Sequence, residues 1–128
     1  MATIDITTET FKDTVATDGI VLVDFWAEWC GPCRQFGPIY SAASERHENI
    51  TFAKVDTESN QELSAGLQIT SIPTLMAFRD GVLLYREPGA MPLAGVEKLI
   101  EALENVDMNQ VRADIAEKSG AVPASDAQ

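Results

Sequence analysis

A Cys-x-x-Cys pair that directly follows an apolar run is the feature that most constrains this chain. Residues 20–25 read Ile-Val-Leu-Val-Asp-Phe, which suits a strand buried on both faces of a sheet, and Cys30 and Cys33 follow after a short aromatic turn. Pro32 suits the first turn of a helix, because its missing N–H would have no partner there. The pattern predicts a strand, a turn and a helix whose N-terminus carries both cysteines.

The position of the two cysteines predicts thiol–disulfide exchange. A three-residue spacing puts Cys30 and Cys33 on one face of the helix. Unpaired N–H groups and the helix dipole favour an anion at this end, so we expect Cys30 to ionise more readily than a free cysteine. Cys33 lies one turn further in and is expected to be the more sheltered thiol. It is therefore the candidate to resolve a mixed disulfide that Cys30 forms with a substrate.

Two segments resemble the thioredoxin family. They are residues 26–33, Trp-Ala-Glu-Trp-Cys-Gly-Pro-Cys, and residues 71–74, Ser-Ile-Pro-Thr. The resemblance covers roughly the first hundred residues, and a string of this length with two Trp and both Cys is specific. It implies an α/β thioredoxin fold, with a central mixed sheet of four to five strands and helices on both faces.

The chain continues beyond the length of a usual thioredoxin. We expect a thioredoxin domain over residues 1–106 and a short helical extension over 107–118, because Asp107 resembles a helix N-cap. Val111 and Ile115 are four residues apart and give this helix one thin apolar stripe. Residues 119–128 are small and polar and predict a disordered tail.

Asp24 is the discordant residue of the buried strand. Loss of water raises the pKa of a buried carboxyl, which lets it exchange a proton near neutral pH. Asp24 is thus the candidate base that takes the proton of Cys33. An Asp placed at a sheet edge or hydrogen-bonded for structural reasons fits the spacing equally well. The resemblance favours the base, since thioredoxins carry an Asp with this role at the matching position.

Lys54 is the second discordant residue, because it lies in an alternating strand predicted over residues 50–55. Paired with Asp24, its ammonium would offset part of the raised pKa of that carboxyl, and similar thioredoxins carry a Lys here. The alternative is a buried stem whose head reaches solvent. Cys30, Cys33, Asp24 and Lys54 form the predicted catalytic set.

The resemblance also implies a substrate-binding surface. In thioredoxin-like folds the proline that matches Pro73 is cis and lies against the cysteines, and the backbone of the preceding residue, here Ile72, receives an extended substrate strand. Gly89 matches a glycine that lets the partner approach. The predicted substrate-binding residues are Trp29, Gly31, Pro32, Ile72, Pro73 and Gly89.

The composition and charge of the chain limit which partners and which cellular compartment we expect. The chain has 128 residues and a formal net charge of −11, which argues against nucleic acid or an anionic membrane as partner. Residues 1–8 do not resemble a signal peptide, and no apolar run is long enough to span a bilayer. We expect a cytoplasmic monomer. In a reducing compartment two cysteines so close together are expected to be catalytic.

Three function classes remain at this point. The first is a thiol–disulfide oxidoreductase. The second is a zinc or cluster site, which two Cys and the remote His47 cannot complete without a dimer, and we expect His47 to be a solvated residue at a helix end. The third is a non-catalytic module that binds a partner around Trp29, Ile72 and Gly89.

The first class is favoured, and it predicts a reductant. Gly31 and Pro32 supply no cationic side chain to stabilise a thiolate between the cysteines. The resemblance implies no bound cofactor, with electrons supplied by a flavin-dependent, NADPH-using thioredoxin reductase. It implies clients such as peroxiredoxin, methionine sulfoxide reductase and ribonucleotide reductase.

Overall fold

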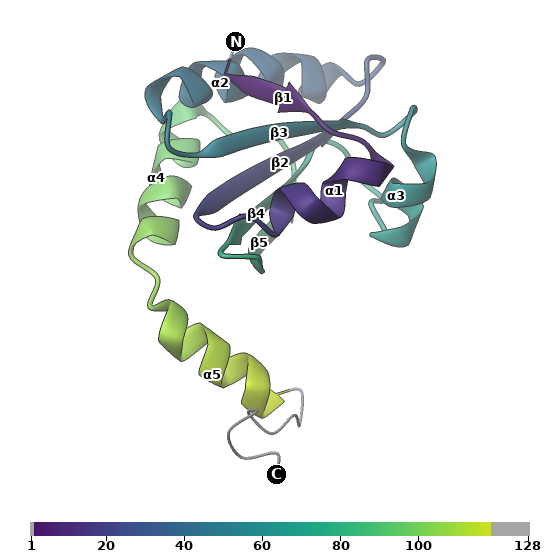
Figure 1. Ribbon diagram of the computed structural model, residues 1–128. Coiled ribbons are helices and arrows are strands. Elements are labelled where there is room, and N and C mark those ends of the chain that lie inside the picture. The colour runs from purple at the N-terminus through teal and green to yellow at the C-terminus, as the bar shows by residue number, and fades with distance from the viewer. Residues whose placement is uncertain (1, 119–128) are drawn as a thin grey trace.

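The computed structural model describes residues 2–118, which form a five-stranded sheet with helices on both faces (Figure 1). The elements in chain order are β1 (Thr3–Asp5), α1 (Thr8–Val15), β2 (Ile20–Trp26), α2 (Gly31–Arg46), β3 (Thr51–Asp56), α3 (Gln61–Gly66), β4 (Thr74–Arg79), β5 (Val82–Pro88), α4 (Leu93–Glu104) and α5 (Met108–Lys118). The sheet order is β1-β3-β2-β4-β5. Strands β1, β3 and β2 run parallel, whereas β4 is antiparallel to β2 and β5 is antiparallel to β4. The predicted mixed sheet is confirmed.

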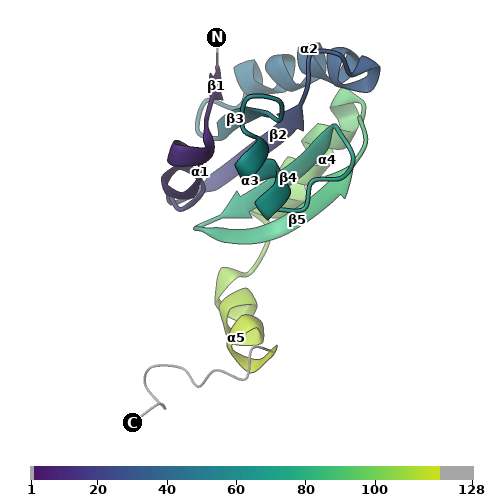
Figure 2. The ribbon, with the colours of Figure 1, turned by 90° about the vertical axis from the view of Figure 1, so that its right-hand side faces the viewer.

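Strand β2 lies at the centre of the sheet and contributes to both halves of the core. Because side chains alternate between the faces of a strand, Ile20 and Leu22 pack with α2 and α4, whereas Val21, Val23 and Phe25 pack with α1 and α3. Figure 2 shows α1 and α3 on one side of the sheet and α2 and α4 on the other. The apolar run therefore fixes the strand that leads into the cysteines.

The β4–β5 connection is the hairpin that Asp80 and Gly81 predict. Both residues have positive φ, at 53° and 83°, as a two-residue hairpin turn requires. The Asp80 carboxylate also accepts a hydrogen bond from the Gly19 N–H at 2.8 Å, which ties the turn to the start of β2. The hairpin sets the antiparallel register of the strand that follows Pro73.

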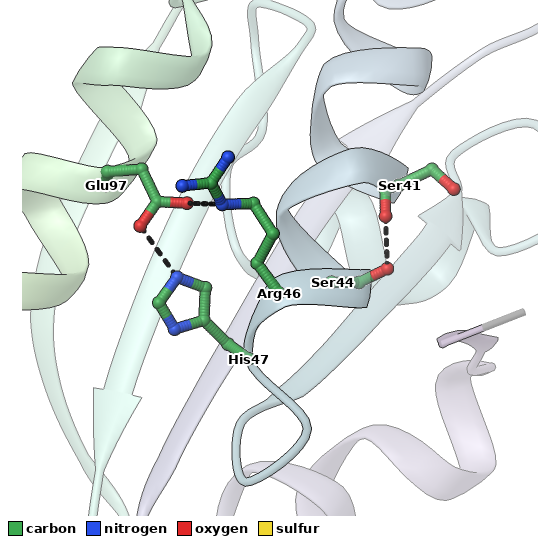
Figure 3. A network of polar contacts seen from close by, with 5 residues as sticks. All are labelled: Ser41, Ser44, Arg46, His47 and Glu97. Carbon is green, nitrogen blue, oxygen red and sulfur yellow. Dashed lines mark hydrogen bonds and ion pairs between the residues drawn. The ribbon is translucent and has the colours of Figure 1, made fainter.

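His47 is not the solvated residue that the sequence predicted. Its Nε2 lies 2.7 Å from Glu97 Oε1, while Arg46 Nε lies 3.2 Å from Glu97 Oε2, so both residues at the end of α2 meet one carboxylate of α4 (Figure 3). The His47 side chain is only 20% exposed. The contact links α2, which carries the cysteines, to α4, and the two helices are far apart in the sequence.

Helix α5 begins where the sequence predicted and points away from the sheet (Figures 1 and 2). Asp107 Oδ1 accepts hydrogen bonds from the N–H groups of Asn109 and Gln110, as an N-cap does. Met108 is buried, but Ile115 is 47% exposed, so the predicted apolar stripe does not pack along its length on the domain. The predicted tail over 119–128 lies outside the described residues.

Candidate active site

The N-terminus of α2 holds both cysteines. The Cys30 N–H donates to the Ala27 carbonyl at 3.2 Å and closes the turn after β2, and Cys30 is the N-cap of the helix, with φ −88° and ψ 115°. Pro32 lies in the first turn, where a missing N–H costs no helical hydrogen bond. The Cys33 N–H donates to Cys30 Sγ at 3.2 Å. An N–H of the first helical turn thus donates to the sulfur that was predicted to carry negative charge.

Cys30 and Cys33 form a disulfide bond, with their Cα atoms 5.2 Å apart. Whole-residue exposure is 5% for Cys30 and 4% for Cys33, so burial does not separate the two as the sequence analysis expected. Their surroundings do, because Cys30 Sγ lies 3.6 Å from the Ile72 carbonyl oxygen of the loop before β4. The two sulfurs, Ala27, Trp26 and Ile72 form one small apolar cluster.

The loop that faces Cys30 contains Pro73, and the Ile72–Pro73 peptide bond is cis, as the resemblance implies. The Pro73 carbonyl accepts a hydrogen bond from the Gly89 N–H at 2.7 Å. Gly89 has φ +104°, and no atom lies within 4 Å of the position that a Cβ would occupy there. The backbone at Gly89 therefore joins the cis-proline loop to the end of β5 and leaves the space above it open.

A cleft of about 310 Å³ lies beside this loop. Trp29, which is 68% exposed, and Ile72 line one part of it, and α3 with its flanking loops lines the rest. The other lining residues, none of which the sequence analysis singled out, are Thr57, Glu58, Gln61, Ser64, Ala65, Ile69 and Thr70. Gly31 and Pro32 are exposed at the helix N-terminus. The lining combines apolar side chains, among them Trp29, Ile69 and Ile72, with polar ones, a mixture that suits a peptide side chain.

Asp24 is buried beneath the cysteine-bearing helix, with 1% exposure. Desolvation raises the pKa of this carboxyl from 3.8 to about 7, and the positive charge of Lys54 offsets part of that rise. Neither carboxyl oxygen has a hydrogen-bond partner among the residues of this structure. Asp24 therefore has the titration range of a proton acceptor near neutral pH, as the sequence analysis expected.

Lys54 lies opposite Asp24 in the parallel β2–β3 register, but the predicted ion pair between them is absent from residues 2–118. Its ammonium instead lies over the ring of Trp26, 4.8 Å from the ring centroid. This distance is within the range of a cation–π interaction. The charge of Lys54 still lowers the pKa of Asp24, as pairing would, although the two side chains form no ion pair.

Two further residues, both close to Asp24, were also missed by the sequence analysis. Trp26 was noted only as part of the family string, although strand alternation places it on the same face as Asp24. Tyr40, a buried residue of α2, donates a hydrogen bond to the Ala53 carbonyl at 2.8 Å. Burial, and then the charge of Asp24, raise the pKa of Tyr40 above its usual range. The alternation of β2 is the sequence signal that could have indicated that Trp26 lies beside Asp24.

Comparison with known proteins identifies the family. The family model described as Thioredoxin matches residues 2–105. The chain belongs to the thioredoxin family. A thioredoxin of Mycobacterium tuberculosis is 41% identical over 110 residues, covering 84% of this chain and 92% of that protein. A Streptomyces coelicolor protein that carries a thioredoxin name is 46% identical over 117 residues, covering 91% and 87%.

A third relative is a longer protein whose name gives two functions. The bifunctional thioredoxin reductase/thioredoxin of Mycobacterium leprae is 38% identical over 109 residues, which cover 84% of this chain but 23% of that longer protein. The similarity is thus confined to a minor part of the fused protein.

Membership of the thioredoxin family and the Cys30–Cys33 disulfide make this chain a thiol–disulfide oxidoreductase with protein-disulfide reductase activity. Thioredoxins carry no prosthetic group, and the described part of the chain contains no group of three or more His, Cys, Asp or Glu placed to hold a metal ion. Within residues 2–118, no helix combines the length and apolar character needed to span a bilayer.

Proposed function

We propose that this chain reduces disulfides in client proteins, with Cys30 as nucleophile and Cys33 as resolving thiol. The Cys30 thiolate attacks one client sulfur, so that a Cys30–client disulfide forms and the other client sulfur leaves as a thiolate. The Cys33 thiolate then attacks Cys30 Sγ and releases the second client thiol. The client gains two electrons, and the protein is left with its Cys30–Cys33 disulfide.

The observation that carries this proposal is the N–H of Cys33 directed at Cys30 Sγ at the start of α2. A donor in this position stabilises a thiolate on Cys30 more than a thiol, and so lowers the cost of forming the nucleophile. Gly31 and Pro32 add no positive charge to this stabilisation. Since a strongly stabilised thiolate makes a protein more oxidising, the modest stabilisation here supports a reducing role.

Asp24 is proposed as the base for the second step. The Cys33 thiol must lose its proton before it attacks, and a carboxyl with a pKa of about 7 is ionised in part and accepts protons near neutral pH. Lys54 is proposed to tune this carboxyl through its charge. Cys30, Cys33, Asp24 and Lys54 together form the proposed catalytic set.

The client is proposed to bind in an extended form along the loop at Ile72 and Pro73. Trp29 and the cleft beside it would accept a client side chain, and the open backbone at Gly89 would allow close approach. Gly31 and Pro32 are exposed at the helix N-terminus between the two cysteines, and they are proposed to contact a client bound at Cys30.

We further propose a cytoplasmic monomer whose dithiol is regenerated by an NADPH-dependent flavoprotein thioredoxin reductase. The fused reductase of the Mycobacterium leprae relative supports this electron source. Peroxiredoxin, methionine sulfoxide reductase and ribonucleotide reductase are the proposed clients. Residues 1–106 are proposed as the redox domain and 107–118 as a separate extension, which agrees with a family match that ends at residue 105.

Reduction of insulin disulfides tests the function. The full chain, supplied with NADPH and a thioredoxin reductase, is expected to consume NADPH in proportion to insulin, because each client disulfide takes two electrons. Cys30→Ser should abolish consumption. A non-catalytic binding module would bind insulin or another oxidised client without NADPH consumption, and that result would overturn the proposal.

A further inference from the structure

Three side chains meet on one face of the sheet below the disulfide. Asp24 and Trp26 are two residues apart on β2, so they point to the same face, and Lys54 is the register partner of Asp24 on the parallel strand β3. Asp24 is buried, whereas Trp26 and Lys54 are half-buried. The Lys54 ammonium therefore has two possible partners within one surface, the carboxyl of Asp24 and the ring of Trp26.

The structure places the ammonium on the ring. Lys54 Nζ lies 4.8 Å from the centroid of Trp26, while both oxygens of Asp24 remain without a hydrogen-bond partner in the described chain. An ammonium over the face of an indole is attracted by the negative face of the ring, and Trp is the strongest of the aromatic side chains in this respect. The ring thus competes with the carboxylate for the same cation.

We propose that Trp26 is a positioning residue that holds the Lys54 ammonium away from Asp24, so that the carboxyl keeps its proton to higher pH than a direct ion pair would allow. This inference rests on the role proposed above for Asp24 as the base of the resolving step. Trp26 would thereby set how much of the carboxyl is available to receive the Cys33 proton at neutral pH.

The other groups around Asp24 leave Lys54 as the cation that matters there. From α2, the Tyr40 hydroxyl already donates to the Ala53 carbonyl at 2.8 Å. The residue of β4 opposite Asp24 is the apolar Leu75, and the buried core residues of α4 on this side of the sheet, Val96, Ile100 and Leu103, are also apolar. Burial raises the pKa of Asp24, and Lys54 is the charge that lowers it. A change in where Lys54 sits should therefore move the titration of this carboxyl.

The test is the titration of the Asp24 side-chain carbon by NMR in the oxidised full chain. Trp26→Leu should free the ammonium to approach the carboxylate and lower the pKa of Asp24 by about one unit, a tenfold rise in its acid dissociation constant. Trp26→Phe keeps a weaker aromatic face, so its shift should have the same sign and be smaller. If the Leu variant does not fold, the Phe variant carries the test.

The same Trp26 substitutions in a protein that lacks the Lys54 ammonium distinguish the effect of the ring on Lys54 from the effect of water that enters the site. Removing the indole could also hydrate Asp24, which lowers its pKa whether or not a cation is present. In Lys54→Met protein the shift caused by Trp26→Leu or Trp26→Phe should shrink to less than half. Equal shifts in both backgrounds, or no shift from any Trp26 variant that folds, would overturn the proposal.

The titration is independent of the base role itself. If Asp24→Asn leaves the resolving step unchanged, the proposed function of Asp24 fails, yet the NMR shifts still report whether Trp26 positions Lys54. Conversely, Asp24→Asn could slow the resolving step while the Trp26 variants shift the pKa of Asp24 equally with and without Lys54. That result would support Asp24 as the base and refute the positioning role of Trp26.

Discussion

The active site has an inner side and an outer side, which differ in exposure to solvent and in the chemistry of their side chains. The inner side is Asp24, Trp26 and Lys54, on β2 and β3. The outer side is Trp29, Ile72 and Gly89, where Trp29 is 68% exposed beside a cleft of about 310 Å³. Only the inner side holds a carboxyl whose pKa is raised by burial. Only the outer side offers open space to another chain.

This difference predicts which property a substitution on each side should change. In a buried, poorly solvated region a single charge changes the energy of every nearby proton transfer, because water does not screen it. On an exposed surface the same substitution changes contact area with a partner and leaves proton chemistry alone. Inner variants should alter rates and pH profiles, whereas outer variants should alter client affinity.

The largest expected effect lies between the two sides, at Cys33. Cys33→Ser removes the resolving thiol, so turnover should fall to the background level while Cys30 becomes trapped as a mixed disulfide with its client. Non-reducing gel electrophoresis and mass spectrometry of the adduct measure this. The matched control is the double variant Cys30→Ser/Cys33→Ser. A Cys33→Ser protein that turns over normally, or that forms no adduct with an oxidised client, would refute the assigned roles.

The second effect tests the burial of the inner side through stability. The native state holds the Asp24 proton with a pKa of about 7 and the unfolded state with a pKa of 3.8, so this group makes stability fall as pH rises between those values. The full cost is about 4 kcal/mol at about 1.4 kcal/mol per pKa unit. The free energy of unfolding of Asp24→Ala, relative to that of wild type, should therefore increase by about this amount as the pH rises from about 4 to about 8.

Urea denaturation at several pH values measures that difference. The small cavity left by alanine is independent of pH, so the change with pH isolates the carboxyl. Asp114→Ala, on the exposed part of α5, is the control and should run parallel to wild type. If the free energies of unfolding of Asp24→Ala and wild type changed with pH in the same way, Asp24 would be exposed to water, and its raised pKa would be refuted.

The third effect tests the outer side at Trp29. Trp29→Ala removes the large exposed ring beside the cleft, so KM for insulin should rise roughly tenfold with kcat nearly unchanged, as for a central contact residue. Steady-state kinetics separates the two constants. Leu83→Ala is the matched control, since Leu83 is 45% exposed but lies near the hairpin end of β5. A fall in kcat with unchanged KM would place Trp29 in the chemistry instead.

The smallest effect distinguishes the backbone of the outer side from its side chains. Gly89 has φ +104°, a conformation that L side chains rarely adopt, so Gly89→Ala should destabilise the fold by about 1 kcal/mol although the space above it is open. Gly31→Ala, where the space is also open and φ is not positive, is the control and should stay within about 0.5 kcal/mol of wild type. Thermal denaturation measures both. Equal effects would show that φ at Gly89 relaxes.

The local parts of this picture were predictable from sequence, since local patterns determine them. An apolar run before Cys30 predicted β2, and Pro32 predicted the start of α2. Asp80 and Gly81 predicted the hairpin, and Asp107 predicted the cap of α5. Each signal acts within a few residues of the structure that it forms.

The rest depended on contacts between distant segments. Alternation places Asp24, Trp26 and Lys54 on strand faces, but only the β2–β3 register decides that they meet, and only the packed side chains decide which partner the ammonium takes. Likewise, Glu97 reaches His47 from fifty residues away, which no local pattern encodes. The contact of Cys30 Sγ with the Ile72 carbonyl likewise joins residues 42 positions apart, so no local pattern indicates it.

The most direct test of the central claim is the pH dependence of the resolving step in wild type and Asp24→Asn. The Cys30 mixed disulfide is formed by rapid mixing with a client disulfide, and its decay is followed. The wild-type rate should rise through about pH 7 as Asp24 ionises, and the variant should be roughly 100-fold slower at pH 7 and lack that inflection. The same rate and the same profile in both proteins would contradict the account.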